Sequence, residues 1–156
     1  LSALILIGIF IPISLKLYLG TKKGTYTNFD VSNREQRKGF FPIVLVLFGL
    51  IIAFLYFTHQ PKYILQPFLF AFLLMSICYV ANFFSKVSLH TSLTLFLGFL
   101  ILPINLTIGI GMILFAFLMA WSRLYLKRHS LSEILYGGLI GTIVGILYLI
   151  WINFNQ

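Results

Sequence analysis

Residues 121–133 read WSRLYLKRHSLSE and separate two strongly apolar runs of the chain. This stretch holds three cationic side chains, one histidine and Glu133, one of only three acidic residues in the sequence. Charged groups are expensive to place inside a membrane, and those that occur there usually mark a functional site. The stretch therefore indicates a polar site at the mouth of two hydrophobic helices.

The composition of the whole chain points to a membrane protein. Of its 156 residues, 60% are hydrophobic and 9% are charged, whereas a soluble domain is about half apolar and about a quarter charged. We therefore expect an all-α, polytopic bundle in the cell membrane. The spans should be helices, because backbone groups without hydrogen-bond partners cost free energy in lipid.

The formal net charge of +8 suggests an anionic partner. The cations sit at the ends of apolar runs rather than on one broad face. Membrane lipids and phosphate groups are therefore the expected partners, and nucleic acid is not. The chain begins at Leu1 without a methionine or a basic leader, so we expect no cleavable signal peptide and a true N-terminus further upstream. The sequence leaves the oligomeric state open.

Polar breaks divide the chain into six apolar stretches, which predict about six transmembrane helices in a single membrane-embedded domain, residues 1–156. Their ranges are 1–19, 40–58, 63–84, 89–102, 105–121 and 132–153. The fourth stretch is short and stops at Pro103. Because Pro and Asn favour turns, residues 102–105 are expected to join two separate spans.

Six spans would bring the connections at 20–39, 85–88 and 122–131 to one side of the membrane. Every lysine and arginine except Lys62 belongs to that side, as do His90 and His129. The positive-inside rule explains the lysines and arginines and would make this side cytoplasmic. A shared active site would also explain the histidines. Both interpretations stay open here, and so does the membrane face that carries the site.

The spacing of residues 122–133 predicts a catalytic pair. His129 and Glu133 are four residues apart, so they can meet on one helix face. A carboxylate beside an imidazole selects its tautomer and stabilises its charged form. Arg123 would present a planar fork to a phosphate-like anion. The alternative is structural, because Ser130 and Glu133 also fit the capping box that begins a helix.

Two further clusters carry candidate phosphate ligands. Ser88 can cap the fourth span and leave backbone N–H groups for an anion, and His90 in the first turn could then protonate a leaving oxygen. Arg34, Arg37 and Lys38 share a predicted helix face and could clamp phosphate oxygens. In isolation, His90 could instead be an interfacial histidine, and the three cations could bind lipid headgroups.

A repeat of small residues marks the last span. Gly137, Gly141 and Gly145 recur every fourth position. Such spacing makes a groove that admits a neighbouring helix at close range. We interpret the repeat as structural, and it would seat Glu133 firmly against the bundle.

Together these residues resemble a known family. SR-x5-H-x3-E in residues 122–133 is similar to the third signature of the type 2 phosphatidic acid phosphatase superfamily, SR-x5-H-x3-D, with Glu133 in place of Asp. The residues VSLH at 87–90 keep the Ser and His of the second signature, PSGH, but have Leu89 where the family has Gly. The first signature, K-x6-RP, is absent as written, and the basic stretch before Pro42 is its nearest counterpart.

The resemblance implies a membrane lipid phosphatase that needs no metal and no cofactor. His129 would be the nucleophile, Glu133 would orient it, and His90 would act as general acid and then base. The phosphoryl oxygens would be held by Arg123, Ser88, Arg34, Arg37 and Lys38. The substrate would be a lipid phosphate or diphosphate, such as polyprenyl diphosphate, phosphatidylglycerophosphate or phosphatidic acid. A lipid phosphotransferase and a non-catalytic protein that binds anionic headgroups remain alternatives.

Overall fold

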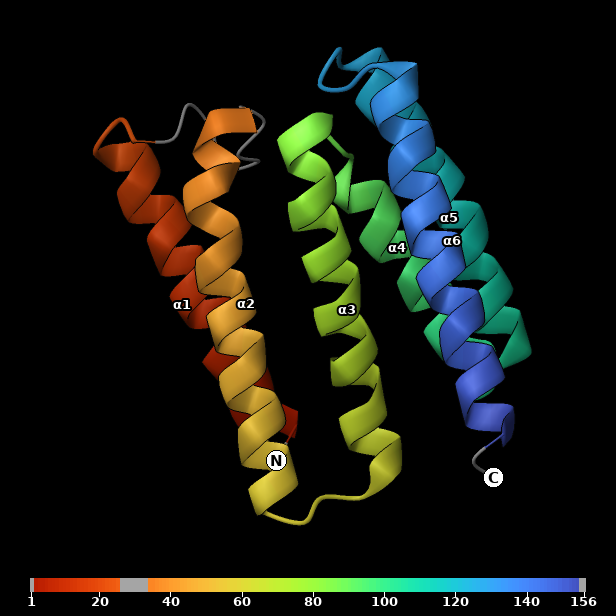
Figure 1. The fold of residues 1–156 in the computed structure, drawn as a ribbon. Coiled ribbons are helices and arrows are strands. Elements are labelled where there is room, and N and C mark those ends of the chain that lie inside the picture. Colours follow the sequence, from red (N-terminus) through yellow and green to blue (C-terminus); the bar gives the residue numbers. More distant parts are fainter. Residues whose placement is uncertain (1, 26–33, 155–156) are drawn as a thin grey trace. The chain divides into compact units, whose positions relative to one another are not determined.

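The computed structural model describes residues 2–25 and 34–154, and helices make up nearly all of them (Figure 1). The described residues contain six helices and no strand, which confirms the all-α prediction. The helices are α1 (Ser2–Lys22), α2 (Arg34–Phe57), α3 (Lys62–Phe84), α4 (Leu89–Ile101), α5 (Leu106–Tyr125) and α6 (Leu131–Phe154). The chain divides into two compact units, Leu1–Phe68 and Leu69–Gln156. The prediction of a single domain stays a prediction.

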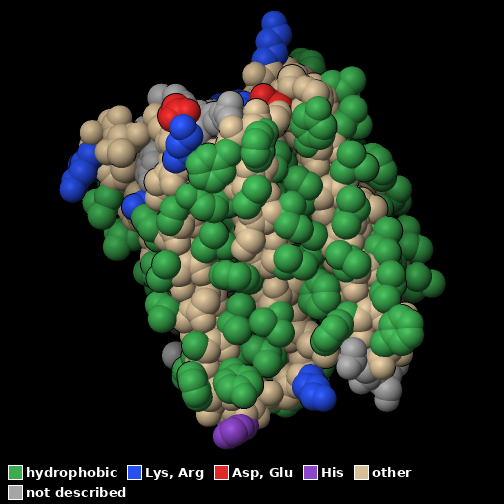
Figure 2. Space-filling view, in the orientation of Figure 1, with side chains coloured by type: hydrophobic (Ala, Val, Ile, Leu, Met, Phe, Trp, Pro, Cys, Tyr) green, Lys and Arg blue, Asp and Glu red, His purple; other side chains and the backbone are tan. Residues whose placement is uncertain are grey.

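Four helices of the described chain are long and apolar enough to cross a membrane, namely α2, α3, α5 and α6. Their outward surfaces are apolar, and exposed side chains on α5 and α6 include Phe117, Leu139 and Ile143. Hydrophobic side chains cover most of the face shown in Figure 2, and charged ones lie near helix ends. These features describe a multi-pass membrane protein, because lipid rather than water would cover such surfaces.

The fourth helix is short, as the apolar stretch 89–102 indicates, and it is shorter than a bilayer needs. With 13 residues at 1.5 Å per residue, α4 is about 20 Å long, whereas the hydrocarbon core of a bilayer is about 30 Å thick. The predicted turn at residues 102–105 is present: Asn105 caps α5, and its side-chain oxygen accepts from the backbone N–H of Ile108 at 3.0 Å. Helices α4 and α5 therefore form a tight antiparallel pair of unequal length.

The glycine repeat of α6 packs directly on α4, as the sequence predicts. A Cβ added at Gly137 would lie 2.6 Å from the carbonyl oxygen of Ser88, and one at Gly141 would lie 2.4 Å from that of Ser92. No side chain fits between backbones at such distances. The hydroxyl of Ser92 donates to the carbonyl of Gly137 at 2.9 Å, which links the two helices further.

A small apolar core lies further along α4 and α6 in the same unit. Leu74, Phe96, Val144 and Tyr148 form it, and they come from α3, α4 and α6. The ring of Phe70 meets the ring of Tyr148 edge to face, with centroids 5.5 Å apart. This core holds the three helices together and leaves the start of α4 beside the start of α6.

Candidate active site

The α5–α6 connection turns back on the end of α5. Lys127 adopts a left-handed backbone conformation with φ 52°, which reverses the chain direction. The backbone N–H groups of Arg128 and His129 then donate to the carbonyl oxygen of Arg123, at 3.0 and 3.3 Å. These bonds fix the connection, and they bring His129 to the last turn of α5 with 6% of its surface exposed.

His129 and Glu133 form a close pair. Nδ1 of His129 lies 2.7 Å from Oε2 of Glu133. An ionised carboxylate only accepts hydrogen bonds, so Nδ1 carries the proton and donates it to Glu133. Nε2 then holds the lone pair of the neutral ring. The contact thus defines which ring nitrogen carries the proton, and the role of His129 as a nucleophile stays a prediction.

The capping box is also present, so Glu133 takes part in the helix cap as well as in the contact with His129. The backbone N–H of Ser130 donates to Oε2 of Glu133 at 3.3 Å, and the backbone N–H of Glu133 donates to Oγ of Ser130 at 3.3 Å. Both contacts are long for hydrogen bonds. The cap nevertheless fixes where α6 begins, and it orients the same carboxylate oxygen that contacts His129.

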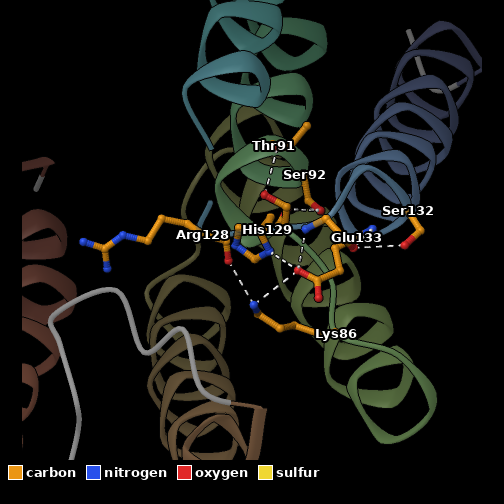
Figure 3. A network of polar contacts seen from close by, with 9 residues as sticks. Lys86, Thr91, Ser92, Arg128, His129, Ser132 and Glu133 are labelled. Atoms are coloured by element: carbon orange, nitrogen blue, oxygen red, sulfur yellow. Dashed lines mark hydrogen bonds and ion pairs between the residues drawn. The ribbon is translucent and has the colours of Figure 1, made fainter. Parts of the chain in front are cut away.

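Lys86 joins this pair from the connection between α3 and α4. Its Nζ lies 3.2 Å from Oε2 of Glu133 and donates to the carbonyl oxygen of Arg128 at 3.0 Å. Figure 3 shows Lys86 meeting His129 and Glu133, which belong to a separate segment of the chain. Sequence reasoning counted Lys86 only among the loop cations. Lys86 lies just before the Ser-x-His of residues 88–90, and this position is the sequence feature that could have indicated its place in the site.

The start of α4 lies against the start of α6. Ser88 is the N-cap residue of α4, and its backbone N–H donates to the carbonyl oxygen of Glu133 at 3.0 Å. The Ser88 hydroxyl does not cap the helix but shares a hydrogen bond of 2.9 Å with the hydroxyl of Thr91. The first-turn N–H groups are therefore not used by that side chain, and helix N-termini of this kind bind anions.

His90 lies in this first turn of α4, two residues after Ser88. Since Ser88 is bonded to Glu133 and Glu133 to His129, both histidines lie at the same end of the unit Leu69–Gln156. Arg123 lies in the last turn of α5 at that end. A common end of the unit is a condition for the predicted site but does not test it, and the roles of these residues stay predictions.

The remaining predicted phosphate ligands belong to the unit Leu1–Phe68. The side chain of Arg34 lies outside the described part of the chain. Arg37 is buried, whereas Lys38 is exposed and pairs with Glu35 at 2.7 Å. Arg37 and Lys38 thus have different surroundings, although the sequence placed them on a common face. Their part in binding phosphate stays a prediction.

A segment of this chain is similar to dolichyldiphosphatase 1. The human protein is 39% identical over 49 residues, and that of the primate Callithrix jacchus is equally similar over the same length. The segment spans 31% of this chain and only 19% of the length of those relatives. No protein-family model matches the chain, and no solved structure matches it. The similarity supports a relationship to membrane lipid phosphatases at this coarse level.

Proposed function

We propose that this protein is an integral membrane phosphatase that hydrolyses a lipid diphosphate through a phosphohistidine at His129. The observation that carries the proposal is the 2.7 Å contact between His129 and Glu133 at the mouth of the bundle, beside a helix N-terminus suited to an anion. The similarity to dolichyldiphosphatase 1 supports a diphosphate over a monophosphate as the substrate.

The first step transfers the terminal phosphoryl group to the histidine. Nε2 of His129 attacks phosphorus, a P–N bond forms, and the P–O bond to the leaving lipid phosphate breaks. His90 gives its proton to the leaving oxygen. The charge that develops on the imidazole is stabilised by Glu133, which already accepts from Nδ1.

The second step returns the protein to its starting state. His90, now neutral, takes a proton from a water molecule as that water attacks phosphorus. The P–N bond breaks, inorganic phosphate leaves, and His129 is again neutral at Nε2. The products are the lipid monophosphate and inorganic phosphate, and no co-reactant other than water is consumed.

Binding of the phosphates would depend on charge at the polar end of the helices. The first turn of α4 offers backbone N–H groups, and Arg123 offers a guanidinium fork. Arg34, Arg37 and Lys38 belong to the other unit, Leu1–Phe68, and their assignment as phosphate ligands stays a prediction from the sequence. Phosphoryl transfer depends chiefly on such neutralisation and on positioning of the nucleophile.

The lipid tail would stay in the bilayer during the reaction. The outward surfaces of α5 and α6 are apolar along their length, and the polar residues lie at their ends. A substrate could therefore present its headgroup to the site while its chain remains among lipid tails. The protein would not have to transfer apolar surface into water, which costs about 25 cal/mol per Å².

Phosphate release from a polyprenyl diphosphate in lipid nanodiscs tests this proposal. We expect release by the wild-type chain and its loss in His129→Asn and His90→Asn. His59→Asn is the matched control, because His59 is the third histidine, is exposed and lies between α2 and α3. A rapid acid-free quench should capture phosphorylated wild-type protein that is stable in alkali.

Two results would contradict the proposal. Wild-type protein that binds the lipid but releases no phosphate would support the non-catalytic alternative. Formation of a phosphorylated acceptor lipid without release of free phosphate would support the phosphotransferase. Parallel assays with phosphatidic acid and phosphatidylglycerophosphate decide between diphosphate and monophosphate substrates.

A further inference from the structure

The contacts of Lys86 connect two segments that are distant in the sequence. Lys86 follows α3 and precedes α4, and its Nζ contacts both the Arg128 carbonyl and the Glu133 carboxylate of the α5–α6 region. The side chains of Lys86 and Glu133 are only 20% and 19% exposed. The contact is thus partly shielded from water, and a partly buried pair of charges is screened less than one on the open surface.

Lys86 and His129 lie within hydrogen-bond distance of the same oxygen, Oε2 of Glu133. Their effects on the protonation of His129 are opposite. The carboxylate favours the charged imidazolium, whereas a neighbouring ammonium disfavours it. A histidine next to Glu133 alone would tend to hold a second proton, and its Nε2 would then have no lone pair with which to attack phosphorus.

We propose that Lys86 is a positioning residue that offsets the Glu133 charge, so that His129 stays neutral at Nε2 while Glu133 holds the Nδ1 proton. Lys86 also fixes the backbone that carries His129, through the carbonyl of Arg128. This inference rests on the proposed function, because a neutral His129 matters only if His129 is the nucleophile. Lys86 acts through Glu133 and need not touch the substrate.

Other charged groups surround the same end of this unit. His90 belongs to α4 and Arg123 to α5, and Lys127 and Arg128 belong to the α5–α6 connection. The side chains of Lys127 and Arg128 are exposed, so water screens their effect on His129. Lys86 differs from these two because its ammonium group contacts Glu133 directly and its side chain is only partly exposed.

The pH profile of phosphate release separates this role from a purely structural one. In Lys86→Met, the acidic limb of kcat/KM should move to higher pH by about one unit, because His129 protonates more readily without the ammonium. Lys86→Arg keeps the charge and should keep the limb. Lys127→Met is the matched control, since it removes an exposed lysine from the same region, and it should leave the limb in place.

An NMR titration of ¹⁵N-histidine in the full chain tests the effect of Lys86 on His129 protonation without a measurement of activity. The ring of His129 should titrate at higher pH in Lys86→Met, and the double variant Lys86→Met with Glu133→Gln should lose this increase. A titration and a limb that do not move in Lys86→Met, with a rate reduced equally at every pH, would overturn the inference. If Lys86→Met does not fold, Lys86→Gln replaces it.

The two measurements also separate this inference from the proposed function. The first outcome is a shifted His129 titration in Lys86→Met together with a wild-type protein that releases no phosphate from any lipid. It would keep the effect of Lys86 on His129 and reject the phosphatase. An active wild-type enzyme with an unshifted titration in Lys86→Met would keep the phosphatase and reject the role of Lys86.

Discussion

The backbone N–H of Ser88 donates to the backbone carbonyl of Glu133 at 3.0 Å. This bond ties the start of α4 to the first turn of α6, across more than forty residues of sequence. It places the helix that carries His90 beside the connection that carries His129. The geometry of the candidate site therefore depends on how closely α4 and α6 approach each other.

Substitution of Gly137 should separate the two helices. In Gly137→Ala, the new Cβ would lie 2.6 Å from the backbone oxygen of Ser88, and backbone atoms cannot move aside without moving α4. We expect a loss of about 1–3 kcal/mol of stability and a larger relative loss of phosphate release. Thermal unfolding in detergent and the release assay measure the two effects.

Gly138→Ala is the control for this substitution. Its Cβ would lie 3.7 Å from the side chain of Leu95, an ordinary contact distance. We expect stability and activity close to wild type. Equal effects of the alanine at Gly137 and at Gly138 would show that close helix approach does not govern the site.

The Glu133 carboxylate should matter more to catalysis than to folding. Glu133→Gln keeps the size of the side chain but removes the charge that stabilises the imidazolium, and a loss of about a hundredfold or more in kcat is expected. Glu133→Asp keeps the charge on a shorter chain and should lose less. Steady-state kinetics at one pH, with unfolding measured in parallel, checks both variants.

Glu35→Gln supplies the comparison for Glu133→Gln. It removes an equal charge from an exposed pair with Lys38, and exposed pairs contribute little to stability. Its kcat should stay near wild type. A Glu133→Gln enzyme with the kcat of the Glu35→Gln enzyme would rule out a catalytic role for Glu133.

The rate should depend on pH with a single maximum. Attack requires His129 neutral and departure of the leaving group requires His90 protonated, so the two limbs report opposite protonation states. Histidine changes charge between about pH 5 and 8, where the maximum should lie. A profile of kcat/KM measured across that range in mixed micelles tests the pairing, which a flat profile would exclude.

The Ser92 hydroxyl should contribute to the contact between α4 and α6. It donates to the carbonyl of Gly137 at 2.9 Å and is fully buried. Ser92→Ala is expected to cost about 1 kcal/mol of stability, since a hydrogen bond between membrane helices contributes about that much. Unfolding of the protein in detergent measures this cost.

Ser76→Ala is the matched variant, because the Ser76 hydroxyl bonds only locally, to the carbonyl of Phe72 in its own helix at 2.8 Å. Its loss should change stability little, since such local bonds do not join helices. If Ser92→Ala and Ser76→Ala reduce stability equally, the bond from Ser92 to Gly137 adds nothing to helix association.

Features set by local spacing were predictable from the sequence. The four-residue interval allows His129 and Glu133 to meet, although His129 lies in the connection just before α6 and not on a helix face. Helical spacing also aligns Gly137, Gly141 and Gly145 on one face. Mean composition was enough to predict helices in a membrane, because the bilayer imposes length and hydrogen bonding on every span.

Contacts between distant segments were decided only by the tertiary structure. Lys86 meets Glu133, and Ser88 bonds the backbone of Glu133 while its hydroxyl turns to Thr91. The spacing along one helix cannot specify these contacts, because they depend on the distance and rotation between helices. The sequence thus determined the chemistry of the His129 pair, and packing of α4 against α6 determined which groups surround it.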